Sequence, residues 1–159
     1  MKLYLLRHGL AADREEWSGD DVDRPLTGEG QARMAREAVT LARLGLSLDL
    51  ILTSPLVRAY QTAESVAQRL GMMDKLITDE RLAPGFGADQ LAPLVREHAN
   101  AAALLLVGHE PDFSELIGAL IGGGRVECKK GSLACVNLPD PLRLAGELLW
   151  LLPPKILDV

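Results

Sequence analysis

The chain has 159 residues, 48% of them hydrophobic, and a formal net charge of −5. This length suits one domain with one core, and the acidic balance argues against nucleic acid or an anionic membrane as the main partner. The first apolar run is too short for a signal peptide, and no stretch approaches the roughly 18 apolar residues of a membrane span, so we expect a cytoplasmic protein.

The first predicted element is a short apolar strand, Leu3–Leu6, which leads directly into Arg7. Residues 10–26 are polar and rich in turn-forming residues, so we expect an irregular segment there. Thr27 is a suitable N-cap for a helix that runs to about Leu44, where a glycine follows.

A second strand is predicted at residues 49–53. Ser54 and Pro55 follow it as expected N-cap and first helical residue, the arrangement that helix starts prefer. This helix is expected to end at Leu70, before a glycine, and a short strand is expected at residues 75–78.

The second half continues the alternation of helices and strands. A helix is expected at residues 90–99, and the most apolar strand of the chain at residues 103–107. A further helix is expected at residues 112–121, and two closing strands at residues 133–138 and 147–152 are compatible with a hairpin.

The order of these elements predicts the fold class. Strands that alternate with helices indicate an α/β protein, a three-layer α/β/α sandwich with helices on both faces of the sheet. Apolar strands without period-two alternation suit a mostly parallel central sheet that is buried on both faces. No repeat or linker interrupts the sequence, so we expect a single domain over residues 1–159.

Polar clusters follow three of the predicted strands at their carboxyl ends. Ligands of open α/β sheets bind outside the carboxyl ends of the strands, so we expect the three clusters to meet in one crevice. They are Arg7-His8-Gly9, Ser54-Pro55-x-x-Arg58 and Gly108-His109-Glu110.

The residue types in these clusters suit an anionic ligand. Arg7 offers a planar fork of donors for phosphoryl oxygens, and Gly9 allows a sharp backbone turn beside a ligand. Arg58 is expected as the fourth residue after the helix cap, near the positive end of the helix dipole. His109 is a polar residue that closely follows a very apolar predicted strand. His98 lies at a polar helix end and is expected at the surface. Taken singly, each of these residues is also compatible with a purely structural role.

A metal site is the alternative for the two clustered histidines. Zinc sites need three or four ligands with characteristic spacings, none of which occurs here, and the two arginines would repel a dication. We therefore expect no metal and no other cofactor. Cys128 and Cys135 lack a paired C-x-x-C spacing, so free or buried thiols are favoured over a disulfide or a metal site.

Four segments in this order resemble the histidine phosphatase superfamily, which is also called phosphoglycerate-mutase-like. The resemblance covers nearly the whole chain and implies that fold. The segments are Leu5-Leu6-Arg7-His8-Gly9, Arg24-Pro25-Leu26-Thr27-x-x-Gly30, Ser54-Pro55-x-x-Arg58-Ala59-x-Gln61-Thr62-Ala63 and Val107-Gly108-His109.

Small size and the segment from Gly108 to Leu116 look most like the SixA-type phosphohistidine phosphatases. The resemblance implies that His8 is the nucleophile and becomes transiently phosphorylated. It also implies that Arg7, Arg58 and His109 hold the phosphoryl oxygens, beside the phosphate-binding Gly9. Covalent catalysis of this kind divides one displacement into two steps, and phosphoryl transfer requires mainly positioning and positive charge.

One position departs from the family pattern. Relatives that act on sugar phosphates carry a glutamate in an R-L-x-E pattern, whereas Arg81-Leu82 is followed here by Ala83 and Pro84. Glu80 and Glu110 are the remaining candidates for a proton donor. An alkoxide leaving group needs such an acid, an effect of about 10²–10⁴-fold, whereas an imidazole leaving group needs less help.

The favoured hypothesis is therefore a metal-independent phosphatase that acts on phosphohistidine in a protein, such as a histidine phosphotransfer domain or a phosphocarrier. The alternative within the family is a phosphomonoesterase that acts on a small phosphorylated metabolite, such as a sugar or nucleoside phosphate. A third reading is a binding module for a phosphorylated ligand that keeps the cations without catalysing a reaction.

Overall fold

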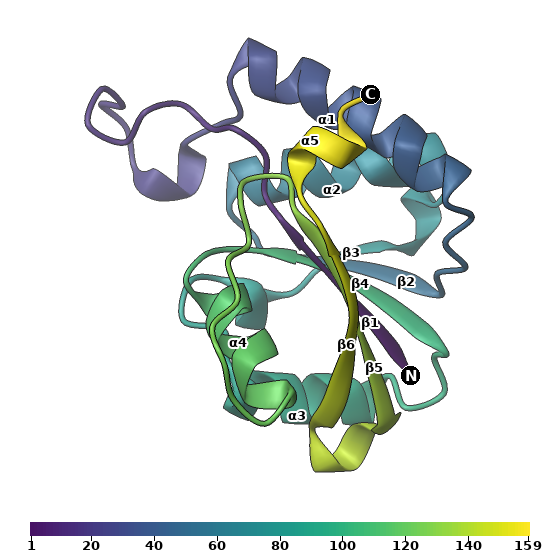
Figure 1. Ribbon diagram of the computed structural model, residues 1–159. Helices are drawn as coiled ribbons and strands as arrows, with labels where there is room; N and C mark the ends of the chain where they lie inside the picture. Colours follow the sequence, from purple (N-terminus) through teal and green to yellow (C-terminus); the bar gives the residue numbers. More distant parts are fainter.

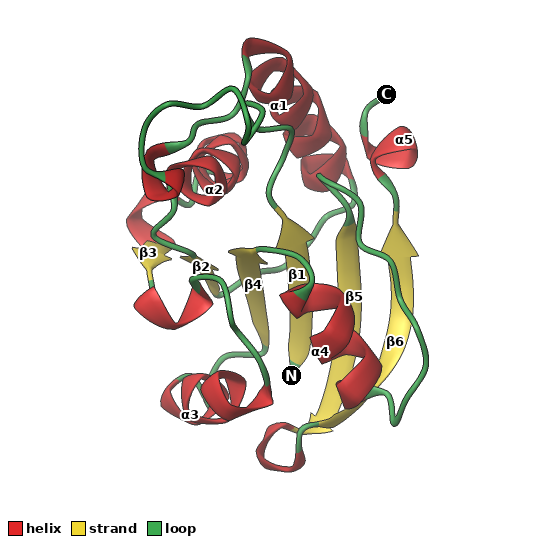
Figure 2. Ribbon diagram, turned by 90° about the vertical axis from the view of Figure 1, so that its left-hand side faces the viewer, coloured by secondary structure: helices red, strands yellow, loops and turns green.

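A mixed six-stranded sheet forms the centre of the protein, for which a computed structural model describes residues 1–159 (Figures 1 and 2). The strand order is β3-β2-β4-β1-β5-β6, and β5 is the one strand that runs opposite to the other five. The prediction of a largely parallel sheet is confirmed. The strands are β1 (Lys2–Arg7), β2 (Leu50–Thr53), β3 (Leu76–Thr78), β4 (Ala103–Gly108), β5 (Leu133–Asp140) and β6 (Ala145–Leu152).

Helices cover both faces of this sheet, as predicted, because successive strand side chains point to opposite faces. Leu6 and Leu105 pack on one face with α1, α2 and α5, whereas Leu5 and Leu104 pack on the other with α3 and α4. The helices are α1 (Gly28–Arg43), α2 (Val57–Leu70), α3 (Ala88–Glu97), α4 (Asp112–Leu120) and α5 (Pro154–Leu157). The result is the predicted three-layer sandwich.

The start of α2 differs from its prediction. Leu56, not Ser54, is the N-cap, and the helix begins at Val57 rather than at Pro55. The reason is that Ser54 is still tied to the strand end, since its backbone N–H donates to the carbonyl of Val107 at 2.9 Å. Arg58 is therefore the second residue of the helix, not the fourth.

Other boundaries follow local capping chemistry. Thr27 caps α1 as predicted, since its Oγ1 accepts from the backbone N–H of Gly30 at 2.9 Å. Helix α3 begins two residues earlier than predicted because the Gln90 side chain accepts from the backbone N–H of Gly87 at 3.0 Å. The predicted closing hairpin is present with longer strands, and the short helix α5 that follows it was not predicted.

Gly30 fixes α1 against the segment that follows β1. A Cβ atom at this position would lie 2.0 Å from the carbonyl oxygen of Leu10, which is inside any tolerable contact. The same carbonyl accepts from the backbone N–H of Thr27 at 3.0 Å. Gly30 of the sequence motif thus permits the start of α1 to pack closely against the backbone of Leu10, two residues after His8.

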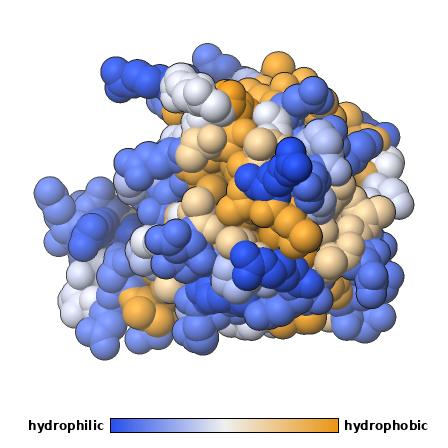
Figure 3. All heavy atoms as spheres, turned by 90° about the horizontal axis from the view of Figure 1, so that it is seen from below, coloured by the Kyte–Doolittle hydropathy of each residue, from blue (hydrophilic) through white to orange (hydrophobic).

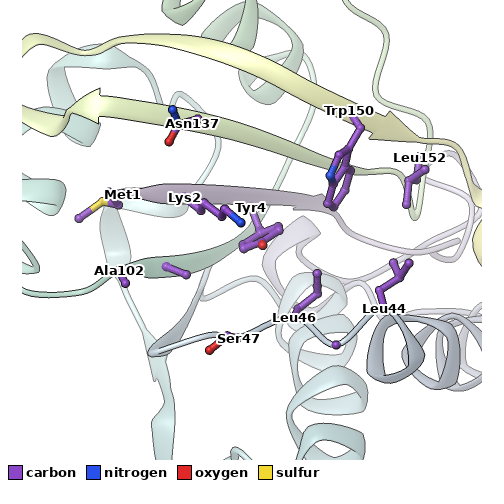
Figure 4. A pocket seen from close by; sticks show the side chains of 12 residues that line it. Met1, Lys2, Tyr4, Leu44, Leu46, Ser47, Ala102, Asn137, Trp150 and Leu152 are labelled. Carbon is purple, nitrogen blue, oxygen red and sulfur yellow. The ribbon is translucent and has the colours of Figure 1, made fainter.

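A hollow of about 830 Å³ opens at the end of the sheet where the parallel strands begin. Apolar residues dominate its lining, and the rings of Tyr4 and Trp150 meet there at 5.8 Å (Figure 4). Figure 3 views the molecule from this end and shows apolar residues gathered in the middle of the surface. None of the predicted site residues lines this hollow.

Both cysteines are buried free thiols, which confirms the preferred prediction for Cys128 and Cys135. The structure contains no helix with the length and apolar character needed to cross a bilayer.

Glu37 is a fully buried carboxylate on α1. Its Oε1 accepts from Arg33 at 3.3 Å, and its Oε2 has no hydrogen-bond partner. A Cβ atom added to Gly131 would lie 2.7 Å from this carboxylate, so Glu37 packs directly beneath that turn. Burial is the main reason that the pKa of Glu37 is raised to about 7.

We expect Glu37 to lower the stability of the folded chain as the pH rises. A carboxyl group with a raised folded-state pKa favours the folded state most below its unfolded pKa and loses this contribution as the pH passes the folded pKa. Relative to Glu37→Gln, the wild-type free energy of unfolding should fall by about 1–3 kcal/mol between about pH 5 and pH 8. Urea denaturation of both proteins at both pH values measures the difference. A constant difference would show that Glu37 is ionised throughout this range.

Candidate active site

The carboxyl ends of β1, β2 and β4 meet in a pocket of about 700 Å³. Three of the side chains that the sequence singled out are nearly inaccessible there: His8, Arg58 and His109 expose 6%, 4% and 3% of their surfaces. Buried polar side chains of this kind need partners. The pocket also has Arg7 and Glu110 in its lining, so all three predicted clusters reach it.

The imidazole of His8 is oriented by its own neighbour. Its Nδ1 lies 2.8 Å from the carbonyl oxygen of Gly9, and a carbonyl oxygen can only accept a hydrogen bond. The proton of the neutral ring is therefore on Nδ1, which leaves the lone pair of Nε2 available. Burial is the main reason that the pKa of His8 is lowered to about 3, so the ring is neutral at physiological pH.

A single hydroxyl connects the His8 segment to helix α2. The Oγ1 of Thr62 accepts from the backbone N–H of Gly9 at 3.0 Å and donates to the carbonyl of Arg58 at 2.8 Å. Thr62 is fully buried. The backbone beside the nucleophile candidate and the first turn of the helix that carries Arg58 are thus fixed relative to each other.

Four arginines line the pocket, and two of them, Arg7 and Arg58, belong to the predicted clusters. Arg7 donates through Nη1 to the carbonyl of Cys128 at 2.8 Å. Arg58 donates through Nη1 to the backbone carbonyl of Asp21 at 2.8 Å and through Nη2 to its carboxylate at 3.0 Å. These contacts fix both planar groups, and preorganised cations of this kind stabilise the charge of a phosphoryl group without further rearrangement.

His109 lies beside His8, with the two ring centroids 5.3 Å apart. Its Nε2 is 2.7 Å from the hydroxyl of Ser54, and burial is the main reason that its pKa is lowered to about 4. The Nε of Arg7, the Nε of Arg58 and the Nδ1 of His109 are buried and have no partner in the protein. Such groups are rare in folded proteins, and the three side chains that carry them all line this pocket. The two guanidinium cations among them suit the pocket to an anion.

The two candidate proton donors are placed differently. Glu110 lies at the pocket, where its carboxylate accepts from the backbone N–H of Ser114 at 3.0 Å and from its hydroxyl at 2.5 Å. Glu80 is exposed and is absent from the pocket lining. Pro84 does line the pocket, so this part of its wall carries no carboxylate.

Sequence reasoning missed three residues that support the site: Asp21, Thr62 and the hydroxyl of Ser54 as a partner for His109. Thr62 and Ser54 belong to the segment that carries the family resemblance, so their positions in that motif were a usable signal. Asp21 lies in the polar segment 10–26, whose path around the pocket no local pattern predicts. No three side chains of histidine, cysteine, aspartate or glutamate come together as a metal-binding group.

The sequence matches known proteins over much of its length. A sequence profile of the histidine phosphatase superfamily (branch 1) matches residues 3–90. The chain is 47% identical over 126 residues to an uncharacterized protein of Picosynechococcus sp., covering 77% of this chain and 74% of the relative. It is 30% identical over 127 residues to the phosphohistidine phosphatase SixA of Escherichia coli K12, covering 77% and 76% of the two chains.

Solved structures give the same result. The structure of the protein histidine phosphatase SixA complexed with tungstate superposes with a TM-score of 0.86 at 25% identity and covers 98% of both chains. The phosphoglycerate-mutase-like α/β fold is thereby confirmed. Together, the profile, the relatives and the superposition show that the chain belongs to the histidine phosphatase superfamily.

Proposed function

We propose that this phosphatase removes the phosphoryl group from phosphohistidine in a protein, through a covalent phosphohistidine intermediate on His8. The observation that carries the proposal is the state of His8, whose Nδ1–H donates to Gly9 while Nε2 is free to attack. Arg7, Arg58 and His109 line the same pocket as His8 and carry groups suited to phosphoryl oxygens.

In the first step, the Nε2 lone pair of His8 forms a bond to phosphorus. The bond from phosphorus to the substrate nitrogen breaks at the same time, and its electron pair stays on that nitrogen. The substrate imidazole leaves as a neutral ring, because its other nitrogen already carries a proton. The ring of His8 becomes cationic, and Gly9 continues to accept from Nδ1–H, while the phosphoryl charge offsets the new positive charge.

In the second step, water attacks the phosphorus of phosphorylated His8. The bond from phosphorus to Nε2 breaks, its electron pair returns to the ring, and the water releases a proton to solvent. Inorganic phosphate leaves, and His8 returns to the neutral form with its proton on Nδ1. Arg7 and Arg58 remain in place through both steps, so the site needs little reorganisation between them.

The presence of Pro84 in the pocket lining, in place of an acidic residue, supports phosphohistidine as the substrate. A phosphate monoester would release an alkoxide, which requires a proton from an acid in the transition state. Pro84 lines the pocket where relatives that act on sugar phosphates carry a glutamate, and it has no proton to give. A leaving imidazole that is already protonated has no such requirement.

Glu110 favours a second candidate, a phosphomonoesterase that acts on a small phosphorylated metabolite. Glu110 lines the pocket, and its carboxyl group is held by Ser114. A protonated Glu110 would supply the acid that Pro84 lacks. The two candidates share His8, Arg7, Arg58 and His109 and differ only in how the leaving group is protonated.

A substrate panel distinguishes them. A phosphohistidine protein and common phosphomonoesters are compared at matched concentrations, by release of inorganic phosphate with the wild-type protein and with Glu110→Gln. We expect kcat/KM to be at least about 10²-fold higher for the phosphohistidine protein, and to be unchanged by Glu110→Gln. Higher activity on a monoester, lost in Glu110→Gln, would establish the second candidate instead.

A further inference from the structure

A second groove of about 610 Å³ adjoins the catalytic pocket, and its lining is strongly cationic. Lys129 and Lys130 contribute to it from the segment before β5, and Lys155 contributes from α5. Arg7 and Arg33 add two further cations, and Glu127 is its one acidic residue. Figures 1 and 2 show both segments at the end of the sheet where β1 ends. We refer to this feature as the lysine groove.

The charges of its lysines are free to act on a partner. Lys129, Lys130 and Lys155 are all exposed, and none of them forms an ion pair within the protein. Arg33 differs, because it is paired with Glu37 and with Asp158 at 3.3 and 3.4 Å. In a chain of net charge −5, this groove is a local positive surface against an acidic background, which favours the approach of an anionic partner.

The lysine groove is continuous with the catalytic pocket. Arg7, Leu10 and Lys130 line both of them. A molecule whose phosphoryl group reaches His8 therefore presents its adjoining surface to the lysines. Because these residues are shared, one substrate can place its phosphoryl group in the pocket and its adjoining surface in the groove.

The exposed, separated lysines of the groove suit the surface of a protein better, as a ligand, than a second phosphate group. A built phosphate site uses fixed, buried donors or the start of a helix, whereas these lysines are exposed and have flexible side chains. They also come from two separate segments, so their charges are spread along the groove. Carboxylates distributed over the surface of a protein complement such an arrangement.

We infer that the lysine groove is a docking surface for acidic residues that flank the phosphohistidine of a protein substrate. This inference rests on the proposed function, since it concerns how that substrate is bound. The groove adds affinity and orientation outside the reacting centre. Its lysines are therefore specificity residues rather than catalytic ones, and they act on KM rather than on kcat.

The test uses two peptides, each phosphorylated on one histidine, with glutamates flanking that histidine in one and glutamines in the other. Lys129→Glu/Lys155→Glu alters the groove without changing a residue of the catalytic pocket. Lys2→Glu/Lys75→Glu makes the same change of charge on exposed residues outside both the groove and the pocket. Dephosphorylation kinetics and fluorescence anisotropy of labelled peptides are measured for both variants and the wild-type protein.

We expect Lys129→Glu/Lys155→Glu to raise KM for the glutamate peptide about tenfold at an unchanged kcat, and to leave the glutamine peptide unaffected. Added salt should reduce the preference of the wild-type protein for the glutamate peptide. Equal effects on both peptides, or an equal loss in Lys2→Glu/Lys75→Glu, would overturn the inference.

Binding separates this inference from the proposed function. If the wild-type protein binds the glutamate peptide through the lysines but does not dephosphorylate it, the docking surface stands and the proposed substrate is wrong. If it dephosphorylates both peptides with the same KM and binds them equally, the proposed function stands and the docking surface is wrong.

Discussion

We expect His8→Ala to abolish both turnover and the covalent intermediate. Brief reaction with a labelled phosphodonor, followed by acid or alkaline quench, should leave label on the wild-type protein that is acid-labile and alkali-stable, as a phosphorylated imidazole is. The alanine variant has no nitrogen at this position, so kcat/KM should fall by about 10⁴-fold or more. The reason lies in the structure, since Nδ1 of His8 is held by the carbonyl of Gly9 and its Nε2 is left available as the nucleophile.

His98→Ala is the matched control for this variant, because His98 lies at the end of α3 and does not line the pocket. It should keep both the label and the activity. Label that persists in His8→Ala would show that another group is the nucleophile. A wild-type protein that binds the phosphodonor without acquiring any label would instead be a binding module without catalysis.

Arg58→Ala should have the second largest effect. The guanidinium of Arg58 is fixed by two hydrogen bonds to Asp21, and its Nε is buried without a partner. Arg58 lines the same pocket as His8 and His109. Loss of these charge-assisted donors should lower kcat/KM by about 10²–10⁴-fold. Arg58→Lys keeps the charge but lacks the planar fork, so we expect it to recover only part of the activity. Steady-state kinetics on the preferred substrate provide the measurement.

Arg69→Ala is the matched control, because Arg69 is an exposed residue in the last turn of the same helix. Its kcat/KM should equal that of the wild-type protein. The melting temperatures of the variants show whether each is folded. A folded Arg58→Ala variant with wild-type kinetics would exclude this arginine from phosphoryl binding.

The order of the elements was predictable from sequence because the signals for it are local. The strand at 103–107 can be predicted from its own apolar residues, and Thr27 can be predicted as a helix cap from the residues around it. The error at Ser54 had a tertiary cause, since its backbone is bonded to Val107 on the neighbouring strand. Local preference predicted a cap there, and a contact between distant segments prevented it.

Sheet topology made it predictable which clusters would line the candidate site. Parallel strands bring their carboxyl ends to one edge, so the clusters after β1, β2 and β4 had to meet. The acceptor for the ring of His8 was not visible in the sequence, because it is a backbone carbonyl, that of Gly9. The pairing of Arg58 with Asp21 was equally hidden, since it depends on how a long irregular segment returns to the pocket.

The floor and the rim of the candidate active-site pocket consist of different kinds of residue. Its floor, with His8 and His109, is buried at the ends of core strands, whereas its rim includes exposed residues such as Arg14, Glu16 and Lys130. Exposed substitutions usually change stability by only about 0.5 kcal/mol or less. Natural variation can therefore alter the rim, and with it the surface that a substrate would meet, while folding constrains the buried residues of the floor. Divergence between homologues in this family should accumulate first at the rim.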